Sequence, residues 1–164
     1  MIPQQPIPCE GAIDSEFSPD ERLFRRLNPA VWFRFGGRAN LRQIWNDQLP
    51  FPTFSVNREK YSNAPEDVLQ PEWPRFANHA IGVLVVGRIP PEMVEGSDRY
   101  VYAVEHCPEN GNIAHSEIRC YRNGARLLDK DAASKTMRVK FRALLGERMD
   151  VYREPIRENA DGAA

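Results

Sequence analysis

The stretch from Arg99 to Cys120, RYVYAVEHCPENGNIAHSEIRC, holds two of the three histidines, two of the three cysteines and three glutamates of this sequence, which are side chains capable of acid–base or nucleophilic chemistry. His115 and Glu117 are two residues apart, so on a strand they share a face, and His106 lies across a short loop from them. Two imidazoles beside a carboxylate can act as general acid and base, with the carboxylate fixing the tautomer of one ring. We therefore predict catalytic roles for His106, His115 and Glu117.

A purely structural interpretation fits the same residues, because a hairpin end is polar whether or not it has a function. In that case Asn110, Asn112 and Ser116 would cap the backbone of the loop. The two interpretations predict different geometries. Catalytic side chains would converge within about 6 Å of one another, close enough for charge coupling, whereas structural imidazoles would be buried singly against backbone carbonyls.

Cysteine and histidine are also the usual ligands of zinc, but their spacing in this stretch does not favour a zinc site. Structural zinc sites usually take their ligands in close pairs such as Cys-x2-Cys. Here His106 and Cys107 are adjacent, so on a strand they point to opposite faces, and His115 and Cys120 are separated in the same way. We predict no metal site, and we interpret both thiols as small, partly buried hydrophobic side chains.

Three elements of the sequence resemble a pattern in short uncharacterised bacterial proteins. They are LFRRL near the start, FSVNREKYS in the middle, and His-x-Pro-x3-Asn-x2-His-x-Glu at 106–117. This resemblance implies a bacterial protein but carries no activity over to this chain.

A second resemblance is to ADP-ribosyltransferase-like folds. A predicted strand bearing Arg34, the helix-like segment NLRQIWNDQL, a strand with Ser55 and a late glutamate, Glu117, follow one another in that order. The resemblance implies that the arginine holds the phosphates of NAD and that Ser55 and Glu117 act at the ribose. Arg25 fits the phosphate-binding role as well as Arg34 does. The resemblance therefore implies an NAD-dependent ADP-ribosyltransferase or glycohydrolase.

The composition is that of one folded domain. The chain has 164 residues, with 41% hydrophobic and 27% charged residues, which is long enough to bury a core without disulfides. Three cysteines, an odd number, form no disulfide framework. The start, MIPQQPIPCEG, lacks the features of a secretory signal, and no apolar stretch reaches the length of a membrane span. We expect a soluble cytoplasmic protein.

Charge is distributed unevenly along the sequence. Residues 1–118 contain 11 basic and 16 acidic side chains, whereas residues 119–157 contain 11 basic and 5 acidic ones. Such a basic block either docks an acidic partner or is neutralised by the acidic part on folding. Our first functional hypothesis is an accessory or interaction protein of a bacterial multi-gene cluster, of defence or toxin type and without a cofactor. A protein partner is favoured over nucleic acid, and the predicted contacts are Lys135, Arg138 and Arg142.

Periodicity and turn signals predict the elements that must position these residues. A short helix, or alternatively a strand, is expected at 18–27 after the Ser18-Pro19-Asp20-Glu21 capping signal. We further predict strands at 30–35, 50–58, 80–89 and 148–152, a hairpin pairing 100–106 with 113–121, and helices at 41–49 and 131–146.

Together, these elements predict an α+β fold, with a mixed, largely antiparallel sheet and two or three packed helices in a single domain. The predicted domain covers 18–157, with a flexible proline-rich arm at 1–17 and a disordered tail at 158–164.

Overall fold

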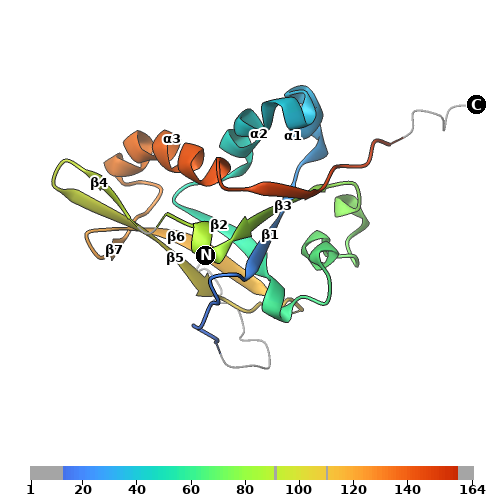
Figure 1. Ribbon diagram of the computed structural model, residues 1–164, viewed down its shortest axis with the longest axis horizontal. Coiled ribbons are helices and arrows are strands. Elements are labelled where there is room, and N and C mark those ends of the chain that lie inside the picture. Colours follow the sequence, from blue (N-terminus) through green and yellow to red (C-terminus); the bar gives the residue numbers. More distant parts are fainter. Residues whose placement is uncertain (1–12, 91, 110, 159–164) are drawn as a thin grey trace, which may run out of the picture.

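A single antiparallel sheet, covered on one face by three α-helices, forms the fold (Figure 1). The computed structural model describes residues 13–90, 92–109 and 111–158. The α-helices are α1 Pro29–Arg34, α2 Leu41–Gln48 and α3 Ala132–Gly146. The strands are β1 Arg22–Leu27, β2 Thr53–Arg58, β3 Ala80–Val85, β4 Met93–Glu95, β5 Asp98–His106, β6 His115–Arg122, β7 Ala125–Arg126 and β8 Asp150–Arg153.

The strand order is β4-β5-β6-β2-β1-β3-β8, with β7 added on β6, and the sheet curls into a half-barrel. Every ladder among the described residues is antiparallel. The predicted α+β single-domain fold is thus confirmed. No helix in the described ranges is both long enough and apolar enough to cross a membrane.

The main core lies between the sheet and the helices, and Trp45 of α2 is at its centre. A β-carbon added to Gly82 of β3 would lie 2.9 Å from the Trp45 ring, and one added to Gly146 of α3 would lie 3.0 Å from its Cβ. Only glycine leaves space for the indole at both places. Phe141 of α3 stacks on Phe51 and completes the contact between helix and sheet.

A smaller core covers part of the opposite face. Phe24 of β1 and Ile81 and Val83 of β3 pack there against Val68 and Leu69. The last two belong to the short 3₁₀ helix η3, Pro65–Leu69, within the long connection between β2 and β3. This connection therefore borders the open face of the sheet.

Of two early elements, the first follows the strand alternative and the second differs from the expected strand. Residues 22–27 form strand β1 rather than the helix, because Leu23 and Phe24 pack into the cores on opposite faces of the sheet. The Ser18 signal only closes a turn, in which the Glu21 N–H donates to the Ser18 carbonyl.

Residues 30–35 were predicted as a strand, but they lie in α1 and its C-terminal cap. The Asn28 side chain accepts a hydrogen bond from the Ala30 N–H, and Pro29 occupies the first helical position. Gly36 follows with φ of 85°, a left-handed conformation that glycine adopts without strain. The local capping chemistry thus outweighs the β-branched and aromatic composition.

The other predicted elements agree with the structure to within a few residues, whereas the short strands β4 and β7 were not predicted. Helix α2, the buried strand β3, helix α3 and the edge strand β8 are all present, and β5 pairs with β6 as an antiparallel hairpin.

Residues 13–17, within the predicted arm, pack against the domain through Arg58. The Arg58 guanidinium is fully buried and forms a two-bond ion pair with Glu21 at 2.8 and 2.9 Å. It also donates to the Asp14 and Glu16 carbonyls and lies over the Phe17 ring. Residues 1–12 and 159–164, where the remaining arm and most of the tail were predicted, lie outside the described ranges.

Replacing Arg58 should therefore destabilise the protein strongly. Arg58→Met would leave the buried Glu21 carboxylate without its partner, and we expect the free energy of unfolding to fall by about 3–5 kcal/mol. Urea denaturation measures the change. Arg22→Met, which removes a half-exposed ion pair with Glu59, is the control and should cost no more than about 1 kcal/mol. Equal losses for the two variants would contradict this role of Arg58.

Candidate functional site

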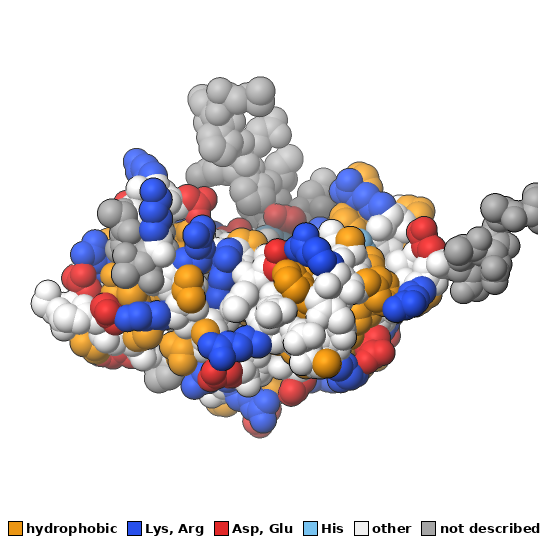
Figure 2. All heavy atoms as spheres, turned by 90° about the horizontal axis from the view of Figure 1, so that it is seen from above, with side chains coloured by type: hydrophobic (Ala, Val, Ile, Leu, Met, Phe, Trp, Pro, Cys, Tyr) orange, Lys and Arg blue, Asp and Glu red, His pale blue; other side chains and the backbone are white. Residues whose placement is uncertain are grey.

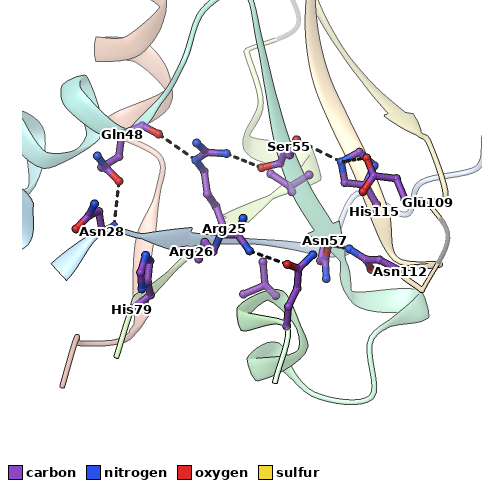
Figure 3. A pocket seen from close by; sticks show the side chains of 13 residues that line it. Arg25, Arg26, Asn28, Gln48, Ser55, Asn57, His79, Glu109, Asn112 and His115 are labelled. Carbon is purple, nitrogen blue, oxygen red and sulfur yellow. Dashed lines mark hydrogen bonds and ion pairs between the residues drawn. The ribbon is translucent and has the colours of Figure 1, made fainter. Parts of the chain in front are cut away.

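A polar pocket of about 440 Å³ opens where β1 and β2 separate (Figure 3). The two strands pair only at Leu23 with Arg58 and Phe24 with Asn57. Beyond that point β1 continues along β3, whereas β2 continues along β6. The lining residues are Arg25, Arg26, Asn28, Gln48, Ser55, Val56, Asn57, Val68, Gln70, His79, Glu109, Asn112 and His115.

Arg25 lies in the gap between the two strands. Its Nη1 donates to the Ser55 carbonyl at 2.7 Å and its Nε donates to the Gln48 carbonyl at 3.0 Å. The first bond satisfies a β2 carbonyl at the point where β1 no longer pairs with it, and the second satisfies a carbonyl at the end of α2. Burial lowers the pKa of Arg25 to about 10, and the charge of Arg26 acts in the same direction.

Arg26 is the second cation of the pocket. Its guanidinium lies 3.6 Å from the centre of the Phe76 ring, and Nη1 donates to the Gln70 side-chain oxygen. Burial and the nearby Arg75 lower the pKa of Arg26. In the described residues, neither Arg25 nor Arg26 forms an ion pair with a carboxylate.

His79 lies beside this pair of arginines. Burial, together with the charge of Arg26, lowers the pKa of its imidazole. The buried Nδ1 of His79 has no hydrogen-bond partner within the described ranges. Because buried polar atoms are usually satisfied, this nitrogen is a candidate contact for a bound molecule.

At the opposite wall, His115 of β6 contacts Ser55 of β2 (Figure 3). Its Nδ1 donates to the Cys107 carbonyl at 2.7 Å, since a carbonyl can only accept. Its Nε2 lies 3.2 Å from Ser55 Oγ and 3.5 Å from a carboxylate oxygen of Glu109. Ser55 is exposed on its strand, whereas His115 is buried. The serine hydroxyl is thus open to the pocket and next to an oriented imidazole.

Amide side chains complete the lining. Gln48 accepts a hydrogen bond from the Asn28 N–H, and the Asn112 amide donates to the Asn57 side-chain oxygen at 2.9 Å. Amides both donate and accept, so they can orient a polar ligand whose charge the arginines bind.

The structure does not assemble the predicted cluster of His106, His115 and Glu117. The hairpin pairs His106 with Ser116, so His106 is on the face opposite to that of His115. His106 Nδ1 accepts from the Asp14 N–H at 2.9 Å, Nε2 donates to the Ile113 carbonyl at 2.7 Å, and the ring stacks on Tyr61. His106 is therefore buried singly among backbone groups, and its predicted convergence with His115 is wrong.

Glu117 shares the face of His115 and lies directly opposite Ser55 in the sheet. Its carboxylate is nevertheless bound by Arg119, at 2.5 and 2.7 Å, and it does not line the pocket. Arg119 also binds Glu105, so these charges form a separate cluster on β5 and β6.

Arg34, the predicted phosphate ligand for NAD, is outside the pocket. It lies at the end of α1, where its guanidinium is 3.2 Å from an Asp47 carboxylate oxygen. Arg25 takes the position next to Ser55 instead. The set Arg34, Ser55 and Glu117 is therefore not assembled around the pocket, and the NAD-dependent reaction stays a prediction from the resemblance alone.

Sequence reasoning predicted Ser55 and His115 but missed Arg26, His79 and Glu109 as pocket residues. Arg26 and His79 come from β1 and from the segment before β3, and no spacing in the sequence connects them to Ser55. Glu109 was close to the predicted cluster, two residues after Cys107, and its loop position next to the histidine was the available signal.

Comparisons of the chain with family models, with curated proteins and with solved structures found no match. The two resemblances drawn from the sequence therefore stay predictions, and the function has to be argued from the pocket.

His106 and Ser55 should respond differently to substitution, because His106 is buried and Ser55 is exposed. His106→Ala removes buried hydrogen bonds to the backbone and should lower the free energy of unfolding by about 1–3 kcal/mol. Ser55→Ala, at an exposed strand position, should change it by no more than about 0.5 kcal/mol. Urea denaturation of both variants measures this contrast. A His106→Ala protein as stable as the wild type would show that the ring has no structural role.

Proposed function

We propose that this protein binds a small organic oxyanion, carrying phosphate or carboxylate groups, in the pocket between β1 and β2. The observation that carries the proposal is the pair Arg25 and Arg26. Both guanidinium groups line the pocket, and neither has a carboxylate partner among the described residues. Cations removed from water without a counter-ion are unfavourable, so an entering anion is stabilised by both.

The form of the pocket supports a small molecule as the ligand. Its volume of about 440 Å³ is within the range of about 300–1,000 Å³ found for small-molecule sites. Arginine is well suited to phosphate and carboxylate because its planar group donates two parallel hydrogen bonds. The neighbouring amides of Asn28, Gln48 and Asn112 supply contacts to the uncharged part of the ligand.

Oxyanions should therefore stabilise the protein against heat. At a ligand concentration of ten times Kd, the gain is about 1.4 kcal/mol, which corresponds to a rise in Tm of about 3–6 °C for a domain of this size. Thermal unfolding with pyrophosphate, citrate and sodium chloride at equal ionic strength separates phosphate, carboxylate and general salt effects.

Arg25→Gln and Arg26→Gln should each abolish the stabilisation. Arg34→Gln makes the same change of charge outside the pocket and should keep the full rise in Tm. The proposal is wrong if sodium chloride stabilises as much as the oxyanions, or if Arg34→Gln and Arg25→Gln behave alike.

A second candidate function is the docking of an acidic protein partner by α3, as the basic C-terminal segment suggests. Lys135 and Arg138 are exposed on this helix, next to the 66% exposed Val139. Arg142 is turned inward and donates to the Leu49 carbonyl, so the basic surface is smaller than the sequence predicts. On the helix-covered side, Lys and Arg side chains are scattered among acidic ones and form no continuous patch (Figure 2).

Charge reversal tests the docking function. Lys135→Glu with Arg138→Glu should abolish co-purification of a partner from the bacterial host at low salt, where electrostatic attraction is strongest. Arg75→Glu changes an exposed arginine that lies outside α3, so this variant should retain the partner. A partner that is retained by the double variant would contradict docking through α3.

A further inference from the structure

Ser55 and His115 have the geometry of a nucleophile and its general base. In the neutral imidazole, the single proton is on Nδ1, where it is held by the Cys107 carbonyl. Nε2 then carries the lone pair and accepts the hydroxyl proton of Ser55 across 3.2 Å. In enzymes that form an acyl–serine intermediate, a histidine activates the serine, and a third group orients the histidine.

The backbone fixes both members of the pair. Ser55 and His115 lie on neighbouring strands whose register runs from Thr53 with Arg119 to Asn57 with His115. Residues on paired strands keep their separation more firmly than residues on loops, and catalysis depends on such positioning. His115 is buried and orients one nitrogen inward, while Ser55 is exposed toward the pocket.

Positive charge lies beside the serine as well. The Arg25 guanidinium bonds the main-chain carbonyl of Ser55 at 2.7 Å, so it is held next to the residue whose hydroxyl would attack. An attack on an ester carbonyl places negative charge on the carbonyl oxygen, and a fixed cation nearby stabilises that charge. The same pocket holds Arg26, which is available for a second anionic group.

We propose that Ser55 and His115 form a catalytic pair that hydrolyses an ester bearing an oxyanionic group, with Arg26 and Arg25 holding that substrate. This inference rests on the proposed binding of an oxyanion in the same pocket.

The reaction balances with water as the only co-reactant. Ser55 Oγ forms a bond to the carbonyl carbon while its proton moves to His115 Nε2. The bond to the alcohol then breaks, and His115 gives the proton to the departing oxygen. Water attacks the acyl–serine next, His115 takes a proton from it, and the bond to Oγ breaks as Ser55 recovers its hydrogen. An ester and water thus become an acid and an alcohol.

The alternative is that the contact between Ser55 and His115 is only a polar contact across two strands. A structural contact would make no covalent adduct, so labelling with a fluorophosphonate separates the two roles. We expect one added mass per chain, located on Ser55 by peptide mapping. It should be absent in Ser55→Ala and reduced at least about 100-fold in rate in His115→Gln, in line with the loss of a general base.

Ser62→Ala is the matched control for the serine. Ser62 follows the same strand, and its hydroxyl donates to the Arg58 carbonyl outside the pocket. This variant should label like the wild type. Thermal unfolding of each variant shows that it is folded, and Ser55→Ala should still be stabilised by pyrophosphate or citrate.

Ester hydrolysis tests the substrate class. The mono-4-nitrophenyl ester of succinic acid should be hydrolysed with a kcat/KM about 10-fold above that of neutral 4-nitrophenyl butyrate, the gain expected of one charge-assisted contact. Arg26→Gln should remove this preference by raising KM for the succinate ester, whereas Arg34→Gln should keep it.

The outcomes distinguish the catalytic proposal from the binding proposal. If the folded wild type is not labelled at Ser55 and hydrolyses neither ester above the buffer rate, the catalytic pair is overturned, while oxyanion stabilisation leaves the binding function intact. If labelling occurs but neither oxyanions nor Arg26→Gln have an effect, the pair is catalytic and the substrate class is wrong.

Discussion

The unequal pairing of β2 with its two neighbours is the constraint on which the rest of the structure depends. β2 pairs with β6 over five residues but with β1 over only two. The parting of β1 from β2 leaves backbone groups without a ladder partner, and the Arg25 side chain satisfies one of them. The pocket exists because of this gap, so the same irregularity that interrupts the sheet also brings β1, β2 and β6 side chains together around one space.

The fully buried Arg58 and the partly buried pair Arg25 and Arg26 differ in how their charges are compensated. Arg58 is fully enclosed, and carboxylate and carbonyl oxygens satisfy its guanidinium from several sides. Within the described ranges, Arg25 donates to two main-chain carbonyls, Arg26 donates to a side-chain amide oxygen, and the pKa of each arginine is lowered. The compensated guanidinium of Arg58 holds the segment before β1 against the sheet. Arg25 and Arg26 line a pocket without a carboxylate partner among the described residues, and the proposed oxyanion would compensate their charge there.

The sequence predicted some of the residues of the candidate site, but it did not predict which of them come together. Ser55 and His115 were both identified from the sequence, although for two different reactions, and the structure places them in one contact. His106 was grouped with His115 because the loop between them is short. A strand turns successive side chains to alternate faces, so a register that pairs His106 with Ser116 separates the two imidazoles. Register depends on the loop geometry, which spacing alone does not specify.

The sequence by itself determined the elements whose signals are strong and local. The apolar run of β3, the periodic stripes of α2 and α3 and the alternating hairpin of β5 and β6 each follow from side-chain period. Only the tertiary structure decided the identity of residues 22–27 and 29–34, because capping signals and β-forming residues competed there and packing on two cores settled the strand. It also decided which arginines share a pocket. Arg25 and Ser55 are 30 residues apart, and contacts at that separation arise from strand order, which no local pattern contains.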